Sequence, residues 1–313
     1  MSEQDAAKPR HVFLVDGSGY IFRAFHALPP LTRSDGTPTN AVLGFVNMIT
    51  KLLDETDADH LAVIFDAGRK TFRNDVYKEY KAHRPEPAPE LIPQFGLIRE
   101  ATRAFNVSCI EMDGFEADDL IATYADHALK AGANDVTIVS SDKDLMQLVT
   151  DKVKLWDPMK NKSIGPAEVK EKFGVAPDKV IDVQALCGDT SDNVPGVPGI
   201  GIKTAAELIN TYGSLDKLLD CLNEIKQPKR RESLTTNAEL ARISRTLVTL
   251  KHDVPIEHAL STFARRAIDP DMLYAFLRAN EFRTALTRAQ NKLGSQVSAE
   301  AKAPPATGGS APS

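Results

Sequence analysis

Short apolar runs that alternate with longer amphipathic stretches constrain the fold of this chain more than any other feature. The runs are residues 11–16, 61–66, 135–140 and 153–156, and the helical patterns between them are residues 41–53, 91–105 and 117–130. Strands that alternate with helices in this way pair into a parallel sheet with helices on both faces. The runs at 12–15 and 62–65 are apolar at every position, which is typical of central strands in such a sheet. We therefore predict an α/β domain with a mostly parallel central sheet over residues 11–164.

The second half of the chain is dominated by helical periodicity. Four stretches carry it: residues 167–173, 179–186, 204–212 and 239–250. Gly and Pro residues separate them, and we predict a C-terminal α-helical lobe over residues 165–293. Both ends are predicted to be disordered. Residues 1–10 mix charges without an apolar core, and residues 294–313 form a linker or tail rich in Ala, Ser, Pro and Gly.

Composition and charge exclude several classes of protein. No apolar run approaches the ~20 residues that span a bilayer, and residues 1–10 carry no secretory signal. Three widely spaced cysteines suit a reducing cytosol, so we predict a cytoplasmic protein without membrane contact. The net charge of −5 argues by itself against a nucleic-acid partner. However, if nine of the acids gather in one site, the rest of the chain carries +4, and distribution rather than total charge decides the partner.

Acidic side chains follow three of the predicted strands. Asp16 and Asp66 close the first two runs, and Asp142 and Asp144 follow the third. The carboxyl ends of parallel strands meet at one edge of the sheet, where ligands bind, so we expect these four side chains in one crevice. An aspartate after a strand is also an ordinary turn or capping residue, and that is the alternative for each one taken alone.

Two further stretches add five acids to this group. Glu116, Asp118 and Asp119 open the helical pattern at 117–130, and Asp189 and Asp192 lie in a Gly-Asp-Thr-Ser-Asp-Asn sequence. Helix capping and a polar turn are the alternatives here. Nine ionised carboxylates in one crevice would repel one another unless cations were bound, and their oxygen atoms suit Mg²⁺, with Mn²⁺ as a substitute. Two such ions can activate water and stabilise the leaving oxygen of a phosphodiester. The predicted metal ligands are Asp16, Asp66, Glu116, Asp118, Asp119, Asp142, Asp144, Asp189 and Asp192.

A glycine-rich sequence at residues 194–205 gives a second signal. It misses the phosphate-loop pattern by one residue, because Ile202 stands before Lys203 and Thr204. It resembles a helix-hairpin-helix, which we place at residues 194–212. The glycines of such a hairpin let backbone amides approach a nucleic-acid phosphate, and the next helix N-terminus favours the anion. A tight turn between helices is the alternative. The DNA contacts predicted in this hairpin are Gly196, Gly199, Gly201, Lys203 and Thr204.

Residues 69–84 form a basic stretch with six cationic and two acidic side chains, and prolines follow to residue 93. Beside a carboxylate site such cations hold the DNA backbone and neutralise charge that the metal ions do not. Without such a site they would be a solvated surface. We expect residues 69–93 to form a basic arch or gateway, with Lys78 as one DNA contact. Tyr80 either stacks on a base or packs in the core, and both interpretations stay open.

Six motifs in a fixed order resemble one family. They are Val-Asp-Gly-Ser-Gly at 15–19, Thr-Phe-Arg at 71–73, Tyr-Lys-Ala-His-Arg-Pro at 80–85, Gly-Phe-Glu-Ala-Asp-Asp at 114–119, Ser-Asp-Lys-Asp at 141–144 and Gly-Asp-Thr-Ser-Asp-Asn at 188–193. The ordered set is similar to the bacterial 5′-nuclease domain at the N-terminus of DNA polymerase I, a relative of the flap endonucleases. The match runs from about residue 11 to residue 293 and implies a flap-nuclease-like α/β fold.

The resemblance also implies roles for particular residues. The metal ligands of the family fall on the nine acids already named. Lys81 and Arg84 correspond to cations near the scissile phosphate, which makes them the expected catalytic cations, and Arg23 and Arg73 correspond to further DNA-backbone contacts. The hairpin corresponds to an element that grips duplex DNA and can hold K⁺. Phe22 departs from the family, where Tyr is common, so this position keeps a ring for stacking but has no hydroxyl.

The function implied by the resemblance is that of a structure-specific 5′-3′ exonuclease and 5′-flap endonuclease that hydrolyses phosphodiesters with two metal ions. Such an enzyme removes RNA primers and flaps in DNA replication and repair. Its expected partners are flapped, nicked or 5′-ended duplex DNA and RNA–DNA primer junctions, and it is expected to be a nucleoid-associated monomer with polymerase domains in the same full-length chain. A non-catalytic helix-hairpin-helix DNA-binding module is the alternative. A haloacid-dehalogenase-like phosphatase is disfavoured, because position 18 is Ser rather than an acid.

Overall fold

Six strands form one sheet in the computed structural model, which describes residues 9–300. The strands are β1 (His11–Asp16), β2 (His60–Ile64), β3 (Ser108–Ile110), β4 (Asp135–Val139), β5 (Val153–Asp157) and β6 (Lys162–Ile164). Their order is β3-β2-β1-β4-β5-β6, and every neighbouring pair is parallel except β5 with β6. The prediction of a mostly parallel sheet flanked by helices is therefore confirmed.

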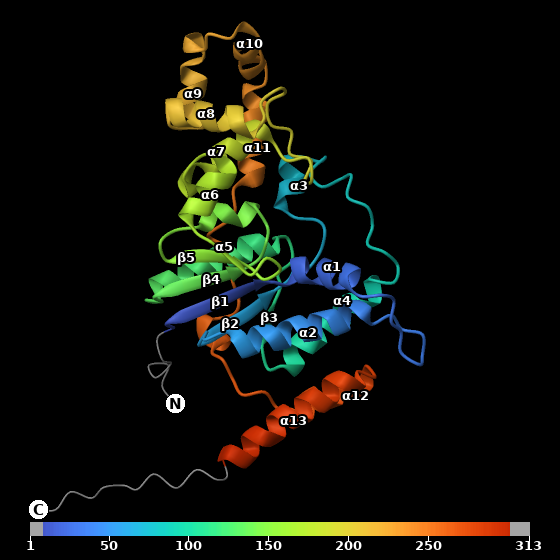
Figure 1. Cartoon of the computed structure of the whole chain (residues 1–313). Helices are drawn as coiled ribbons and strands as arrows, with labels where there is room; N and C mark the ends of the chain where they lie inside the picture. Colours follow the sequence, from blue (N-terminus) through green and yellow to red (C-terminus); the bar gives the residue numbers. More distant parts are fainter. Residues whose placement is uncertain (1–8, 301–313) are drawn as a thin grey trace, which may run out of the picture.

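Helices cover both faces of the sheet and build a lobe above it (Figure 1). They are α1 (Gly17–Ala27), α2 (Asn40–Glu55), α3 (Phe72–Val76), α4 (Ile92–Ala104), α5 (Ala117–Lys130), α6 (Pro166–Phe173), α7 (Val180–Cys187), α8 (Ile202–Tyr212), α9 (Leu215–Asp220), α10 (Pro228–Thr236), α11 (Ala238–Val248), α12 (Pro270–Ala279) and α13 (Arg283–Glu300). Successive side chains of a strand point to opposite faces. Val12 and Leu14 of β1 accordingly join the apolar cluster around α5, and Phe13 and Val15 join the cluster around α1, α2 and α4.

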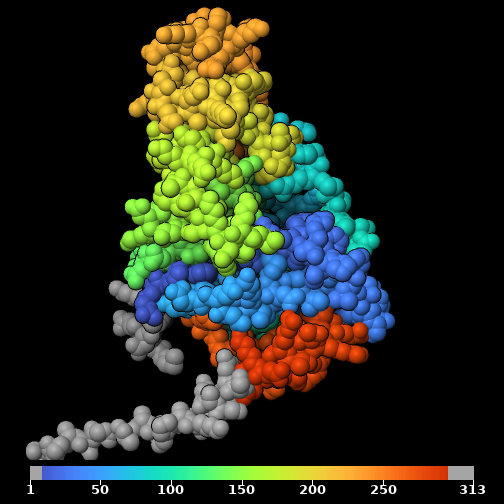
Figure 2. Space-filling model, in the orientation of Figure 1, coloured from blue at the N-terminus to red at the C-terminus, as the bar shows by residue number. Residues whose placement is uncertain are grey.

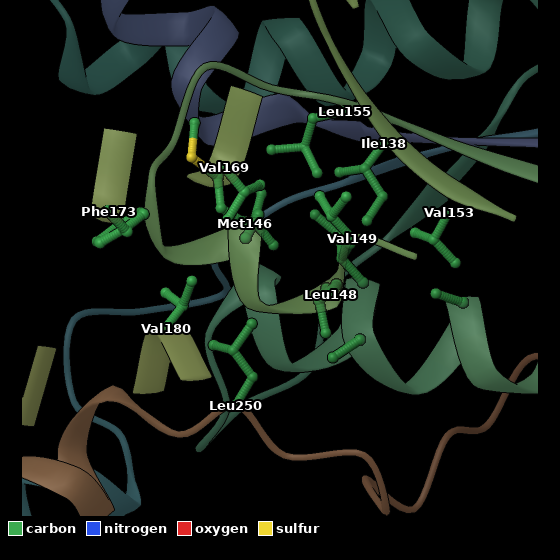
Figure 3. Packing of buried hydrophobic residues seen from close by; sticks show 14 of the residues in the cluster. Ile138, Met146, Leu148, Val149, Val153, Leu155, Val169, Phe173, Val180 and Leu250 are labelled. Atoms are coloured by element: carbon green, nitrogen blue, oxygen red, sulfur yellow. The ribbon is translucent and has the colours of Figure 1, made fainter. Parts of the chain in front are cut away.

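The helical lobe is attached to the sheet by a continuous apolar core. Figure 3 shows Ile138 of β4 and Leu155 of β5 in the same cluster as Val169 and Phe173 of α6 and Val180 of α7. Close packing of this kind resists relative movement. The lobe therefore stands at a defined position above the sheet (Figure 2).

The predicted helical lobe of residues 165–293 is wrong at its C-terminal end. After α11 the chain returns to the sheet, where Arg265 N–H donates to Asp59 O at 2.8 Å. α12 and α13 then pack against the α/β domain, and Leu273, Phe276 and Leu277 join the apolar cluster of α2 and α4. The spacing of these three residues puts them on one side of α12, and that apolar stripe is buried against the helices of the α/β domain.

The predicted disordered ends are only partly within the described residues. α13 continues to Glu300, so the first seven residues of the predicted tail are helical, and the remainder, 301–313, lies outside the described residues. At the other end residues 1–8 lie outside, whereas the Arg10 N–H donates to Asp59 Oδ2 at 2.9 Å. Between residues 9 and 300 we find no helix with the length and hydropathy of a membrane span.

Candidate active site

Two aspartates at the ends of neighbouring strands lie at the same edge of the sheet. Asp16 ends β1, and its carboxylate accepts hydrogen bonds from the Gly19 N–H at 2.9 Å and the Ser140 hydroxyl at 2.8 Å. Asp66 follows β2, and its Oδ1 accepts a hydrogen bond from the Ala117 N–H at 2.8 Å. Because β1 and β2 are parallel neighbours, both carboxylates lie at the carboxyl edge, where α/β sheets bind ligands.

Asp118, in the first turn of α5, lies among the acids from the strand ends. Burial raises the pKa of Asp118 well above its usual value, and Asp142, Asp16 and Asp66 raise it further. Burial likewise raises the pKa of Asp16 to about 6, with added repulsion from Asp142 and Asp66. Like charges shift one another in this way only at short range. We call Asp16, Asp66, Asp118 and Asp142 the strand-edge acids.

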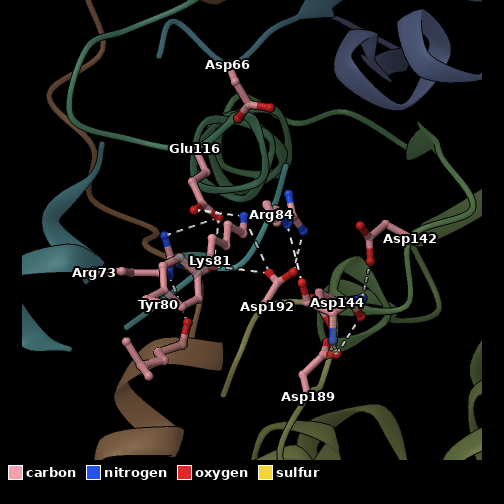
Figure 4. A network of polar contacts seen from close by, with 12 residues as sticks. Asp66, Arg73, Tyr80, Lys81, Arg84, Glu116, Asp142, Asp144, Asp189 and Asp192 are labelled. Carbon is pink, nitrogen blue, oxygen red and sulfur yellow. Dashed lines mark hydrogen bonds and ion pairs between the residues drawn. The ribbon is translucent and has the colours of Figure 1, made fainter. Parts of the chain in front are cut away.

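A second group of acids joins the first through Asp142 (Figure 4). Burial raises the pKa of Asp144 to about 7, and the nearby Asp142, Asp189 and Asp192 raise it while Lys143 opposes them. Lys143 also forms an ion pair with Asp189. Asp142 therefore acts on both groups, and the predicted acids other than Asp119 form one continuous network.

Two cations of the basic stretch lie inside this network. Lys81 Nζ is 2.9 Å from Glu116 Oε1 and 3.4 Å from Asp192 Oδ2, and Arg84 pairs with the other oxygen of Asp192. Burial would lower the pKa of Lys81, but Glu116 and Asp192 raise it above its ordinary value. Its backbone has φ +54°, and its N–H donates to Asp192 O at 2.9 Å. The predicted catalytic cations are thus held directly beside the carboxylates.

The strand-edge acids are carboxylates of this site that could hold metal ions. Among the described residues, no Lys, Arg or His forms an ion pair with any strand-edge acid, whereas Glu116 and Asp192 are paired with cations. Residues 9–294 contain no three acidic, histidine or cysteine side chains arranged to hold one metal ion. Buried carboxylates of like charge raise one another's pKa, and a bound cation offsets that repulsion. Hard oxygen donors of this kind fit Mg²⁺ or Mn²⁺ by their chemistry.

Asp119 and Arg73 do not have their predicted roles. Arg73 is 1% exposed, and its guanidinium donates to both oxygens of Asp119, at 2.7 and 2.8 Å, and to the Leu247 carbonyl at 2.8 Å. Asp119 is fully buried and also accepts from the N–H of Lys251 and of Glu116. Arg73 is therefore closed to DNA and Asp119 to a metal ion. Together they join α3, α5 and the end of α11.

Two further predicted DNA contacts are also enclosed. Tyr80 is 4% exposed, and its hydroxyl lies 3.2 Å from Glu116 and from Asp192, so the packing interpretation holds and base stacking does not. Gly196 is buried, and a Cβ there would lie 2.4 Å from the Gly188 nitrogen. Its N–H donates to the Ser244 hydroxyl, so it serves close packing rather than phosphate contact.

Other predicted DNA contacts remain accessible. Lys78, Gly199, Gly201 and Lys203 are exposed, and Thr204 is half-buried. Gly201 is the N-cap of α8, which places the exposed part of the hairpin at a helix N-terminus. Arg23 is half-buried near the acids, where its Nη2 donates to the Ser141 hydroxyl at 2.6 Å.

Sequence reasoning missed four residues that position the acids. The Ser140 hydroxyl joins Asp16 to the Asp142 N–H, Arg99 donates to the Asp66 carbonyl, and Lys143 pairs with Asp189. Gln184 of α7 is 1% exposed and donates its Nε2 to Asp144, while its Oε1 has no hydrogen-bond partner among the described residues. Only Lys143 carried a signal, since it stands inside the Ser-Asp-Lys-Asp motif.

The site combines carboxylates at the edge of a parallel sheet, cations beside them and an exposed glycine hairpin. These features are typical of an α/β nuclease whose metal ions are held by carboxylates. Two family models match this chain. The 5′-3′ exonuclease, N-terminal resolvase-like domain covers residues 11–174, and the 5′-3′ exonuclease, C-terminal SAM fold covers residues 175–271. The chain belongs to the 5′-3′ exonuclease family.

Curated relatives match most of this chain but exceed it in length. The DNA polymerase I of Rhizobium leguminosarum is 60% identical over 289 residues, which is 90% of this chain and 28% of that protein. The DNA polymerase I of Bacillus subtilis is 40% identical over 283 residues, which is 89% of this chain and 32% of that protein. The chain thus spans about a third or less of these relatives.

Solved structures share the fold. The T5 5′-exonuclease with bound zinc ions covers 86% of this chain and 98% of its own, with 26% identity and a TM-score of 0.65. The catalytic core of Rad2 in complex with DNA covers 88% of this chain and 89% of its own, with a TM-score of 0.58. Its identity of 18% shows the fold alone. The fold prediction of a flap-nuclease-like domain is confirmed.

Proposed function

We propose that this domain is a divalent-metal-dependent, structure-specific 5′ nuclease that acts as a 5′-3′ exonuclease and as a 5′-flap endonuclease. What supports the proposal most is the network of acids from separate segments at one sheet edge, with Lys81 and Arg84 beside it. The T5 structures carry metal ions, and both the T5 flap endonuclease and Rad2 are seen with DNA, which agrees with this assignment.

The strand-edge acids, with Asp144, are the residues that would hold the metal ions. Mg²⁺ is the expected ion and Mn²⁺ its substitute, because both prefer oxygen ligands. A pair of such ions would supply Lewis-acid chemistry, which activates water and stabilises the leaving oxygen of a phosphodiester.

The protein side chains position the substrate and neutralise its charge. Lys81 and Arg84 lie beside Glu116 and Asp192, so either cation can turn from a carboxylate to an incoming phosphate. Both would then stabilise the negative charge that develops on the scissile phosphate. The exposed hairpin around Gly199 and Gly201 would hold the duplex backbone, with K⁺ as a candidate ion there.

The wider biological assignment follows from the relatives. We place the domain at the N-terminus of a DNA polymerase I, as a cytoplasmic, monomeric unit that removes RNA primers and flaps at nicks and primer junctions in replication and repair. The identity to the Rhizobium leguminosarum enzyme over 90% of this chain supports this placement.

The test is cleavage of a 5′-labelled flap duplex with Mg²⁺, and with Mn²⁺ in parallel. We expect products only with divalent metal and with an unpaired or nicked 5′ end. A Lys81→Met variant should bind the flap but cleave it more slowly, since the charge near the phosphate is lost. Intact protein that binds DNA yet cleaves none of these substrates at low salt would favour the alternative, a non-catalytic helix-hairpin-helix module.

A further inference from the structure

The composition of α10 is not explained by packing. Of its nine residues, Pro-Lys-Arg-Arg-Glu-Ser-Leu-Thr-Thr, only Leu234 is buried. A helix that is polar on all sides gains little from a core. Its first turn carries cations and no acid, although the helix dipole favours acids there. The cations of α10 therefore serve neither the core nor the stability of the helix.

Four cations lie in α10 or just before it. We call this group the α10 basic surface, and it consists of Lys226, Lys229, Arg230 and Arg231. Arg230 is half-buried and the other three are exposed. Within the described part of the chain none of the four forms an ion pair, in contrast to Arg242 and Arg245 of α11, which pair with acids. Residues 224–232 have a net charge of +2.

The α10 basic surface adjoins the hairpin. The Ser233 hydroxyl of α10 donates to the Pro198 carbonyl at 2.7 Å, directly before the exposed Gly199. Lys229 and Arg230 precede Ser233 by four and three residues, so they lie on the same side of the helix as this contact. The two cations and the exposed hairpin backbone therefore face one region outside the lobe.

The position of α10 in the fold sets what this region can reach. In Figures 1 and 2 α10 lies at the end of the lobe farthest from the sheet, beyond α7 and α8. A ligand that extends from the strand-edge acids past the hairpin to α10 must be long and regularly charged. The phosphate backbone of a DNA duplex is such a ligand, and it binds cations with release of its counterions.

We propose that the α10 basic surface binds the phosphate backbone of the duplex part of the substrate, farther from the cleavage site than the hairpin. This rests on the proposed function only in taking nuclease substrate as the duplex. The contact makes affinity depend on duplex length, because a short duplex ends before it reaches α10.

The experiment measures binding by fluorescence anisotropy in EDTA, with flap substrates whose downstream duplex is about one or about three helical turns long. Wild-type protein should bind the longer duplex more tightly. In a Lys229→Ala/Arg230→Ala variant, affinity for the longer duplex should fall about 10-fold, with a salt slope smaller by about 1 per lost contact. Affinity for the shorter duplex should change less than about twofold.

Two control variants separate this contact from a general charge effect. Lys130→Ala/Lys152→Ala removes two exposed cations at the opposite edge of the sheet and should leave the length preference intact. Lys229→Arg/Arg230→Lys keeps the charge and should retain it too. Equal losses on both duplexes, or no loss on either, would overturn the proposal. If wild-type protein prefers the longer duplex but cleaves no DNA with Mg²⁺ or Mn²⁺, the nuclease assignment fails and the α10 contact stands.

Discussion

Two groups of acids lie side by side in the site, and they are neutralised in different ways. We call Glu116, Asp119, Asp189 and Asp192 the paired acids, because each meets a Lys or Arg side chain of this chain. The strand-edge acids have no such partner among the described residues, and burial with mutual repulsion raises the pKa of Asp16 and Asp118. The fold supplies cations to the first group and none to the second group, which is the group that we propose to hold metal ions. Adjacent residues of α5, Asp118 and Asp119, fall on different sides of this division.

The largest effect is expected at Asp118. An Asp118→Asn variant should lose roughly 10³-fold in cleavage rate, because one proposed ligand for the metal ions is removed. DNA affinity in EDTA should stay within about twofold, since no DNA contact is assigned to this residue. Single-turnover cleavage of a flap substrate, with binding measured separately, checks both expectations. Cleavage at the wild-type rate would place Asp118 outside the metal site.

The same substitution one residue later should act on stability. Asp119→Asn removes the carboxylate that accepts two hydrogen bonds from the buried Arg73 guanidinium and leaves it only Glu116, 3.7 Å away, so the free energy of unfolding should fall by about 3–5 kcal/mol. Asp118→Asn should instead stabilise the metal-free protein, because it removes a buried carboxylate that repels its neighbours. Urea unfolding of both variants in EDTA is the measurement. Changes of the same sign would show that the division between the two groups is wrong.

Asp118 and Asp119 show which features of the site the sequence could predict and which it could not. The strand-end acids and the parallel sheet followed from local patterns, since apolar runs and their terminal aspartates are read within a few residues. The division between Asp118 and Asp119 did not, because it depends on Arg73, which is 46 residues away and reaches Asp119 only in the folded chain. Successive residues of a helix point in different directions, so the acidic cluster alone could not show which of them faces the strand ends.

The same limit explains the other errors. β3 was not among the predicted strands, because its three residues are too few for a periodic signal. The return of α12 to the α/β domain was missed because it is a tertiary contact that no local pattern encodes. Gly196 was predicted to let the backbone approach a phosphate, because glycine has no side chain. In the structure the missing side chain instead lets the backbone pack closely against Gly188.

The pH dependence of the stability of the metal-free protein should report Asp16 and Asp144. The pKa is raised to about 6 for Asp16 and to about 7 for Asp144, above the usual 3.8, so the folded state holds protons that the unfolded state has released. Stability in EDTA should therefore fall as pH rises from 5 to 8, by roughly 4 kcal/mol. Mg²⁺ should restore more stability at pH 8 than at pH 5, because bound metal requires ionised ligands. Unfolding curves with and without Mg²⁺ at both pH values give the comparison, and a metal-free protein that is more stable at pH 8 would contradict it.

The smallest effect is expected at Gln184, whose neutral side chain donates a hydrogen bond to Asp144. Its Nε2 holds Asp144 without adding charge, and its buried Oε1 is left without a partner among the described residues. A Gln184→Leu variant should therefore raise the Mg²⁺ concentration needed for half-maximal cleavage by about 10-fold, and weaken Mg²⁺ binding in calorimetry to a similar degree, because a ligand is no longer oriented. Gln94→Leu is the matched control, since the Gln94 side chain is equally buried but bonds only to α2 and to the Glu90 carbonyl just before α4. Loss of stability in both variants with loss of Mg²⁺ affinity only at Gln184 would show that positioning, and not packing, is what this side chain supplies to Asp144. Equal Mg²⁺ affinity in both variants would mean that Gln184 contributes only packing. The orientation of Asp144 would then be set by the backbone of Asp144.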